Sequence, residues 1–401
     1  MTSFAVCGDD LMVGGVTLAQ LAVRVGRTPF YAYDRAALSA RVEALRTRLP
    51  AAISLHYAIK ANPMPALVCH MARLVDGLDV ASGQELRVAL DAGMDAAEIS
   101  FAGPAKTATE LAQAVAAGIL LNCESMREIE LLAQIGHELG LRPRVALRVN
   151  PDFELKSSGM KMGGGPKQFG IDAELTPQAL ARVRELDLGF EGFHIFSGSQ
   201  NLRPQAIIEA QQKAYALAHK LAVESDVDIS VLNLGGGLGI PYFPGEQSLD
   251  LAPVGENLAE LVERARQDMP RARLVIELGR YLVGESGIYV CRVIDRKVSR
   301  GQVFLVTDGG LHHHLSASGN FGQVIRKNYP AAIGNRMQSD QREIASVVGP
   351  LCTPLDLLAD RMELPCARAG DLVVIFQSGA YGASASPQGF LSHPAVVEVL
   401  V

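Results

Sequence analysis

The sequence predicts an α/β protein with two parts: a (βα)8 TIM barrel over residues 28–285, and a C-terminal antiparallel β-domain formed by residues 286–401 together with residues 1–27. Three observations lead to this prediction. The chain of 401 residues has room for two or three domains. Short apolar runs alternate with longer segments of helical period up to about residue 285. Beyond that point only strand patterns follow.

Eight short apolar runs are the predicted strands of the barrel: 53–58, 78–80, 99–102, 119–122, 145–150, 190–196, 231–234 and 274–277. The segments of helical period that accompany them include 36–49, which precedes the first strand, and 63–74, 82–92, 107–116, 125–139, 204–223 and 255–268. Strands interleaved with helices favour right-handed crossovers and a parallel sheet. Eight such units fit a TIM barrel, and a doubly wound open sheet is the alternative.

The C-terminal part of the chain alternates apolar and polar residues with a period of two. The predicted strands there are 288–298, 303–307, 343–348, 372–376 and 396–401. This pattern is typical of an antiparallel sheet with one covered face. The polar segment 315–339, rich in glycine and asparagine, is predicted to be a long loop.

Composition excludes several classes of partner. Lys and Arg number 37 against 43 Asp and Glu, so the formal net charge is −6. Proteins that bind nucleic acids or anionic membranes are normally basic, so we expect neither partner. No apolar run approaches the roughly 18 residues of a spanning helix, and the N-terminus lacks the basic region of a signal peptide. The 6 cysteines form no C-x-x-C pair, so we expect reduced thiols in a cytoplasmic protein and no metal site.

Polar residues at the ends of the predicted barrel strands are the candidates for chemistry, because TIM-barrel sites lie at the carboxyl ends of the strands. Lys60 follows the first strand, and Glu277 ends the eighth. The glycine cluster 235–239 follows the seventh strand and would expose N–H groups to a phosphate, although it matches neither G-x-G-x-x-G nor a Walker A loop. A phosphate cradle, a lysine and a carboxylate in one pocket are what pyridoxal phosphate requires.

Eight segments resemble one known family. They are 57–62 (YAIKAN), 77–82 (GLDVAS), 148–151 (RVNP), 192–199 (GFHIFSGS), 235–239 (GGGLG), 277–280 (ELGR), 349–352 (GPLC) and 378–381 (SGAY). In this order they are similar to the fold type III pyridoxal-phosphate decarboxylases of ornithine, diaminopimelate and arginine. That family has a barrel of the alanine-racemase type. Within it, the chain most resembles the branch associated with exosortase A systems.

The resemblance implies a decarboxylase that removes the α-carboxylate of an amino acid. It implies that Lys60 forms the Schiff base with the cofactor and that Glu277 keeps the pyridine nitrogen protonated. Cys352 would come from the partner subunit of a homodimer and reprotonate the α-carbon. The implied cofactor-binding residues are Lys60, Asp79, Arg148, His194, Phe196, Ser199, Gly236, Gly237, Glu277, Gly279, Arg280 and Tyr381.

Several positions depart from the family pattern. Phe196 stands where characterised members have the ring-stacking histidine. His194 then either supplies a polar contact to the cofactor or is a satisfied residue of the barrel interior. Thr353 replaces the acid that follows the catalytic cysteine, and Asp356 remains three residues further on. The segment 309–314 (GGLHHH) replaces an Arg-Pro-x-x-Tyr stretch, and neighbours in its histidine run are unsuited to chelating one metal.

These departures bear on the substrate. We expect Thr353, Asp356 and His312 to contact it, and it is either a small-molecule amino acid or a carrier-linked aminoacyl group. The loop 154–167 carries Lys156, Lys161 and Lys167 without an acid after its first residue. It is either a solvated mobile lid or a docking site for an acidic carrier.

Two alternatives to a decarboxylase remain at the level of sequence. One is a racemase on the same barrel, which would want an arginine at position 277 instead of an acid. The other is a non-catalytic regulator that binds pyridoxal phosphate, and the presence of both Lys60 and Cys352 argues against it.

Overall fold

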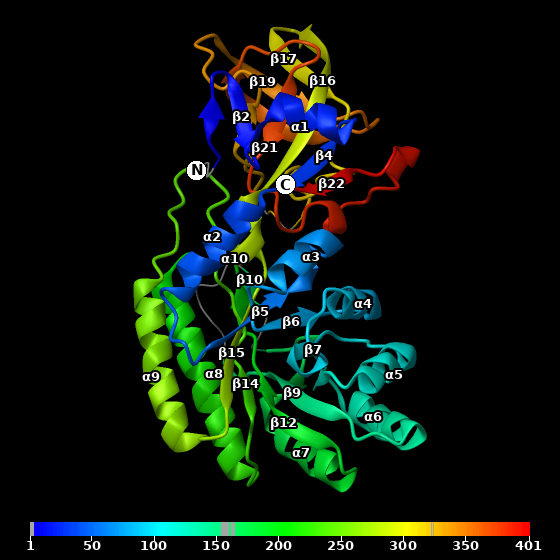
Figure 1. Cartoon of the computed structure of the whole chain (residues 1–401), viewed down its shortest axis with the longest axis vertical. Coiled ribbons are helices and arrows are strands. Elements are labelled where there is room, and N and C mark those ends of the chain that lie inside the picture. The colour runs from blue at the N-terminus through cyan, green and yellow to red at the C-terminus, as the bar shows by residue number, and fades with distance from the viewer. Residues whose placement is uncertain (1–3, 154–159, 162–164, 322, 324) are drawn as a thin grey trace. The chain divides into compact units, whose positions relative to one another are not determined.

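The computed structural model describes residues 4–153, 160–161, 165–321, 323 and 325–401 (Figure 1). The chain divides into two compact units. The first comprises Met1–Arg41, Pro241–Glu246 and Leu282–Val401, and the second comprises Val42–Ile240 and Gln247–Tyr281. In place of the expected limits 28 and 285, the second unit therefore runs from residue 42 to residue 281, with one short excursion.

The second unit is a closed barrel of parallel strands. Its strands are β5 (Ser54–Ala58), β6 (Gly77–Val80), β7 (Ile99–Phe101), β8 (Leu120–Cys123), β9 (Arg144–Asn150), β12 (Gly189–His194), β14 (Val231–Asn233) and β15 (Arg273–Leu278). Each strand pairs with the next, and β15 pairs with β5, which closes the ring. The short strand β11 (Ile171–Asp172) adds to β9. The eight predicted strands and the TIM barrel are confirmed, and the closure excludes the open sheet.

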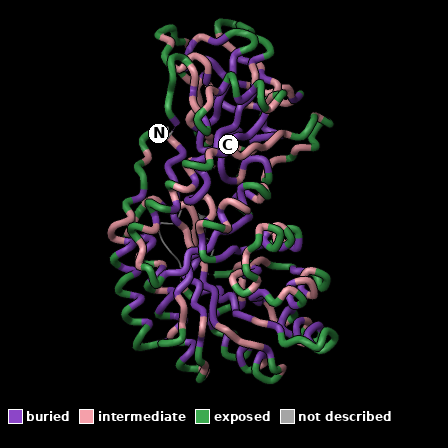
Figure 2. Tube along the Cα trace, in the orientation of Figure 1, coloured by how far each residue is buried: buried purple, intermediate pink, exposed green. Residues whose placement is uncertain are grey.

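Helices cover the outside of these strands (Figure 1). They are α3 (Pro65–Met71), α4 (Gly83–Asp91), α5 (Ala108–Ala117), α6 (Met126–Leu139), α7 (Thr176–Glu185), α8 (Pro204–Glu224) and α9 (Ala252–Asp268), while α2 (Arg35–Arg46) precedes β5. Polar caps set their starts: Ser82, Thr107 and Ser125 each accept a hydrogen bond from a backbone N–H in the first turn. The strands are almost entirely buried, and the outer helix faces are exposed (Figure 2).

The first unit contains the predicted β-domain, in which two of the strand pairings are parallel. Its strands are β4 (Phe30–Tyr33), β16 (Gly287–Ser299), β17 (Gln302–Thr307), β18 (Ala331–Ile333), β19 (Arg342–Val348), β20 (Leu357–Pro365), β21 (Leu372–Ile375) and β22 (Val397–Leu400). β17 pairs with β19, and β22 with β4, in parallel. A period of two is common to both kinds of sheet, so the sequence pattern could not distinguish them.

β4 explains the difference at the N-terminal boundary. It pairs with β16 and β22, so its residues belong to the β-domain instead of the barrel. The preceding strands β1 (Val6–Cys7), β2 (Asp10–Val13) and β3 (Val16–Thr17) lead into α1 (Leu18–Val25). Leu11, Leu18 and Leu21 from this region join Phe30 and Ile288 in one apolar core. The strand β18 interrupts the segment that was predicted to be loop throughout.

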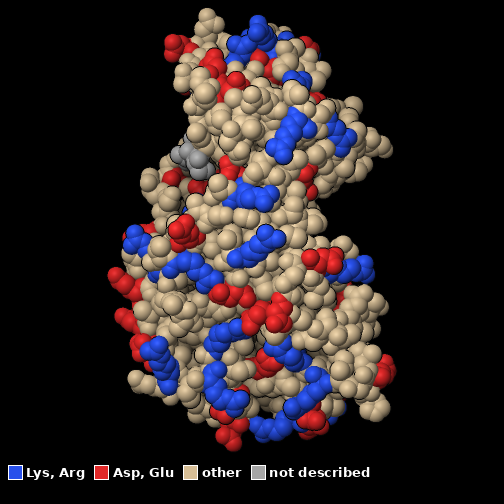
Figure 3. Space-filling view, in the orientation of Figure 1, with Lys and Arg blue, Asp and Glu red and all other residues tan. Residues whose placement is uncertain are grey.

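Charge is mixed over the surface. Lys and Arg side chains alternate with Asp and Glu over the face that Figure 3 shows, and they form no continuous basic patch there. Within the described part of the chain, none of the helices has the length and apolarity needed to cross a bilayer.

Candidate active site

Lys60 lies at the carboxyl end of the barrel strands. It occupies a short 3-10 turn, Ile59–Ala61, that directly follows β5, and its side chain is exposed. Its Nζ atom lies 5.9 Å from the centre of the Phe196 ring, which follows β12. A side chain at Gly279 would place its Cβ 2.9 Å from the Cβ of Ala61, so a glycine there lets the turn after β15 approach the lysine turn. Phe196 and Gly279 therefore lie near the turn that carries Lys60.

Glu277 is a buried, ionised carboxylate at the same end of the barrel. It is 7% exposed, and its Oε2 accepts a hydrogen bond of 3.2 Å from Nδ2 of Asn233. Nε2 of His194 lies 3.4 Å from the same oxygen. Burial raises the pKa of Glu277, but His194, Lys60 and Arg148 outweigh it and hold that pKa well below 4.5. The carboxylate thus stays charged at neutral pH.

His194 contacts the acid. Its Nε2 is within 3.4 Å of the Glu277 oxygen, although among the described residues neither ring nitrogen makes a hydrogen bond of full geometry. This contact with the acid is compatible with either alternative for this position, a polar contact to the cofactor or a residue of the barrel interior. Its side chain and that of Asn233 approach one oxygen from neighbouring strands, β12 and β14.

Asp79 takes part in a polar cluster inside the barrel. Its Oδ1 accepts a hydrogen bond from Oγ of Ser100 and lies 3.2 Å from Nδ1 of His56. Its Oδ2 and the Nε2 of His56 are buried without a hydrogen-bond partner in the described chain. The sequence prediction missed His56 and Ser100, because isolated polar residues inside short apolar runs carry no recognisable spacing.

Arg148 is tied to a second buried carboxylate. Its Nη1 donates to Oε1 of Glu124 at 2.7 Å, and its guanidinium lies 4.9 Å from the centre of the Phe169 ring. Glu124 also accepts from the backbone N–H groups of Gly103 and Gly170. Arg148 thus has its own carboxylate partner, and it acts on Glu277 through its charge.

The glycine cluster forms a turn with no room for side chains. Gly235 and Gly237 have φ values of +71° and +90°, which favour glycine. A Cβ at Gly236 would lie 1.9 Å from the carbonyl oxygen of Glu277, and one at Gly237 would lie 2.6 Å from that of Gly198. A bare backbone of this kind lets an anion approach N–H groups closely, although those of Gly235 and Gly239 already donate to Asn233 and Asn201.

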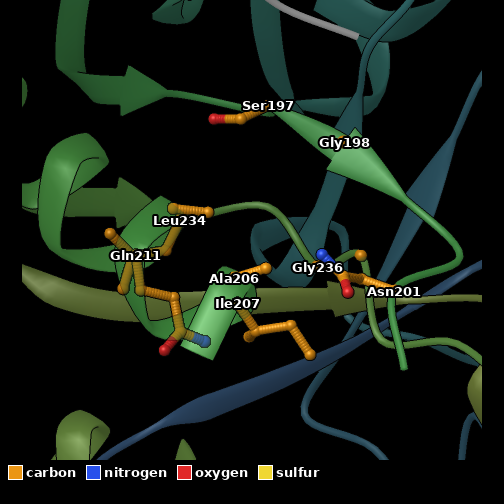
Figure 4. Close-up of a pocket in the computed structure, with 10 residues that line it drawn as sticks. Ser197, Gly198, Asn201, Ala206, Ile207, Gln211, Leu234 and Gly236 are labelled. Carbon is orange, nitrogen blue, oxygen red and sulfur yellow. The ribbon is translucent and has the colours of Figure 1, made fainter. Parts of the chain in front are cut away.

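A small hollow adjoins this turn (Figure 4). Three segments line it: the residues after β12, the glycine turn, and the first turns of α8. The lining residues are Ser197, Gly198, Asn201, Ala206, Ile207, Ala210, Gln211, Leu234, Gly236 and Gly237. Ser199 lies beside it in the short strand β13 (Gly198–Ser199), which pairs with β10 (Met160–Lys161). Arg280 begins the helix α10 (Arg280–Val283) after β15 and is half-buried.

The predicted site residues of the β-domain lie in the other unit. Cys352 is an exposed free thiol on the turn between β19 and β20, with Thr353 beside it. Tyr381 is half-buried, has a φ of +52°, and accepts a hydrogen bond from Oγ of Ser316 at its carbonyl oxygen.

Asp356 differs from its predicted role as a substrate contact. It is only 3% exposed, and each of its carboxylate oxygens already accepts a backbone N–H: Oδ1 from Leu311 at 2.6 Å and Oδ2 from Leu351 at 2.8 Å. The side chain therefore fastens the turn that carries Cys352 to the segment that follows β17. It positions that turn and is not free to meet a substrate.

His312, which was also expected to contact the substrate, is likewise enclosed. It is 0% exposed, with ring centres 3.7 Å from His313 and 5.0 Å from His393. Burial, reinforced by those two histidines, lowers the pKa of His312 to about 3, so the ring is neutral. His313 and His314 contact Pro394 and Ser378. No cluster of three potential ligands, in the ranges that the structure describes, could hold a metal ion.

The lysines of the loop 154–167 are only partly covered by the structure. Lys156 and the side chain of Lys161 lie outside the described residues, and Lys167 lies within them. The hypothesis that this loop receives a carrier rests on the sequence alone.

Comparisons with known proteins agree with this geometry. A family model described as "Pyridoxal-dependent decarboxylase, pyridoxal binding domain" matches residues 35–284. An L-glutamyl-[BtrI acyl-carrier protein] decarboxylase from Niallia circulans is 39% identical over 93% of this chain and 88% of its own length. A diaminopimelate decarboxylase from Aquifex aeolicus is 33% identical over 98% and 90%. The crystal structure of the M. jannaschii diaminopimelate decarboxylase with L-lysine superposes with a TM-score of 0.90 at 25% identity, covering 99% of this chain and 92% of that one.

Proposed function

The chain belongs to the pyridoxal-dependent decarboxylases, and on that premise we propose that it removes the α-carboxylate of an aminoacyl group presented on a carrier protein. It is a pyridoxal-phosphate-dependent amino-acid decarboxylase of the kind that includes the diaminopimelate enzymes. The carrier-linked substrate, the roles of individual residues and the dimeric assembly are our proposals. Association with an exosortase A system stays a prediction from the sequence resemblance.

The residues at the barrel mouth fit the cofactor. Pyridoxal phosphate, when bound, supplies an electron sink for the carbanion that remains after CO2 leaves. In our proposal the Lys60 amine anchors it, and the Phe196 ring stacks against it. The ionised Glu277 carboxylate holds a proton at the pyridine nitrogen, which a neutral or cationic group could not do. The N–H groups of the glycine turn bind the phosphate, with Ser199, Arg280 and Tyr381 as further ligands.

Cys352 is the proposed proton donor to the α-carbon, and it reaches the site from a second copy of the chain. Its exposure in the single chain is consistent with a residue that acts across a subunit interface. A free thiol in this role requires reducing conditions, so the proposal places the enzyme in the cytoplasm.

If each active site contains residues from both subunits, two inactive variants should restore activity when they are mixed. Each mixed dimer of Lys60→Ala and Cys352→Ala subunits holds one site with both residues intact. An equal mixture should then recover about one quarter of wild-type CO2 release, since half the dimers are mixed and half of their sites work. The measurement is activity after the subunits are dissociated and reassociated. If the mixture stays as inactive as its parents, the two residues belong to the same subunit.

The main support for a carrier-linked substrate comes from the hydrogen bonds and the burial of the Asp356 carboxylate. It is the only acid in residues 349–357, where Thr353 follows the cysteine. Each of its oxygens accepts one backbone N–H, and the residue is only 3% exposed. The distal ammonium of a free diamino acid therefore lacks a counter-ion on this turn, and leaving a charge unpaired there is costly. An acyl group bound through its distal carboxyl to a carrier presents no such charge. The 39% identical relative is named for a carrier-linked glutamyl substrate.

Restoring an acid at position 353 should therefore shift the substrate preference. We expect Thr353→Asp to raise kcat/KM for free ornithine or diaminopimelate by about 5-fold, because one exposed ion pair with a bound ammonium is worth at most about 1 kcal/mol. Thr353→Asn is the matched control, with the same shape and no charge. Equal values for the two variants would contradict the proposed reason for the preference.

A further inference from the structure

A single side chain joins the two parts of the candidate cofactor site. Asn233, at the end of β14, is 5% exposed and lies between Glu277 and the glycine turn. Its Oδ1 accepts a hydrogen bond of 2.8 Å from the N–H of Gly235. Its Nδ2 donates to Oε2 of Glu277 at 3.2 Å. The amide oxygen therefore binds the glycine turn, and the amide nitrogen binds the acid.

The orientation of this amide follows from chemistry. A backbone N–H can only donate, so the Asn233 atom that faces Gly235 must be the oxygen. The NH2 group is then directed at Glu277, where an ionised carboxylate can only accept. One fixed rotamer thus satisfies a donor on one side and an acceptor on the other. An aliphatic side chain could satisfy neither, a carboxylate could not donate, and a hydroxyl would have to make both bonds from a single atom.

We propose that Asn233 is a positioning residue that couples the acid Glu277 to the phosphate-binding turn, so that the two ends of the cofactor are held at a fixed separation. This inference rests on the proposed roles of Glu277 and of residues 235–237. The turn lies close to β15 here, because a Cβ at Gly236 would fall 1.9 Å from the carbonyl oxygen of Glu277. A change in the Asn233 amide is therefore transmitted both to the carboxylate and to the turn.

The same contact bears on the charge of Glu277. Hydrogen bonding to the ionised form lowers the pKa of a carboxyl group, and His194, Lys60 and Arg148 are the charged or titratable groups that face it with the same effect. Removing the Asn233 donor while leaving those three in place should raise the pKa of Glu277.

Two variants test the two hydrogen bonds of the Asn233 amide separately. Asn233→Asp keeps an oxygen for the Gly235 N–H but replaces the donor by a second carboxylate. Asn233→Ser keeps a hydroxyl oxygen at the turn, adds no charge, and is too short to reach Glu277. Asn122→Asp is the matched control: Asn122 on β8 is also buried, and together with Asn233 it lines a second small hollow.

The readouts are the pH titration of the absorbance of bound cofactor without substrate, the thermal shift of the cofactor-free protein with inorganic phosphate, and the pH profile of kcat. We expect both Asn233 variants to lose about 10- to 100-fold in kcat, the range for a hydrogen bond to a charged group. In Asn233→Asp, the acidic transition of the absorbance titration should also move to higher pH by about one unit. If this transition lies below the measured pH range in the wild type, it should appear within that range in the variant. The phosphate shift should persist in both variants and disappear in Asn233→Leu, which loses both contacts.

Wild-type titrations in both Asn233→Asp and Asn233→Ser would overturn the inference. An equal shift in Asn122→Asp would overturn it too, because any added carboxylate in the barrel would then suffice. Glu277→Gln separates this result from the proposed function. If Glu277→Gln loses activity while the Asn233 variants behave as wild type, only the positioning role fails. If Glu277→Gln itself keeps wild-type activity, the proposed role of Glu277 in the reaction is wrong.

Discussion

Replacing Glu277 with glutamine is expected to lower kcat by about 10²- to 10³-fold, the range for removal of one preorganised electrostatic group. The substitution keeps the shape of the side chain and an oxygen for the Asn233 donor, so the barrel should fold normally. It removes the negative charge that His194, Lys60 and Arg148 hold in the ionised state. The proton at the cofactor nitrogen then loses its partner.

The measurement is steady-state CO2 release together with the absorbance of bound cofactor. The cofactor should remain bound, so that kcat falls far more than occupancy does. Glu85→Gln is the control, since Glu85 is a half-buried carboxylate that also feels the charge of Lys60 but caps α4 at the N–H of Ala81. Comparable losses in the two variants would contradict a specific role for Glu277.

Replacing Lys60 with alanine is expected to abolish the long-wavelength absorbance of bound pyridoxal phosphate and to lower activity by at least about 10³-fold. The lysine is the proposed covalent anchor, and it sits opposite the Phe196 ring at the barrel mouth. Because the side chain is exposed, its removal should leave the melting temperature of the cofactor-free protein unchanged within about 1 °C.

Lys220→Ala is the matched control for this change, since Lys220 is an exposed lysine that reaches only Glu224, one turn further along α8. It should retain the absorbance and the activity. An intact absorbance band in Lys60→Ala would show that another amine holds the cofactor.

The barrel could be predicted from sequence because each of its strands is a short buried run set between helical segments. β4 could not be assigned in the same way. It is a buried run of four residues whose partners β16 and β22 lie more than 250 positions further along the chain. The parallel pairing of β17 with β19 was missed for a related reason, because alternation records which face is covered and not the direction of the partner strand.

Some residues of the candidate site could likewise be predicted from the sequence, and others could not. Lys60, Glu277 and the glycine turn stand at strand ends, where barrel enzymes place their chemistry, and the structure brings them together. Asn233 was not predicted as a site residue, because a lone asparagine two residues before a glycine is typical of an ordinary turn. Asp356 was assigned to the substrate because it lies close to Cys352 in sequence. Only the fold shows that Leu311, 45 positions away, takes one of its oxygens.

The most direct test of the proposed function compares wild-type kcat/KM for CO2 release from free amino acids and from carrier-linked ones. The free substrates are diaminopimelate, ornithine and glutamate. The linked substrates are L-glutamyl and L-aspartyl groups joined through their side-chain carboxyls to the phosphopantetheine of an acyl-carrier protein, so that the α-carboxylate stays free. We predict that at least one linked group exceeds every free amino acid by about 100-fold or more. Faster release from free diaminopimelate or ornithine than from any linked group would contradict the proposal.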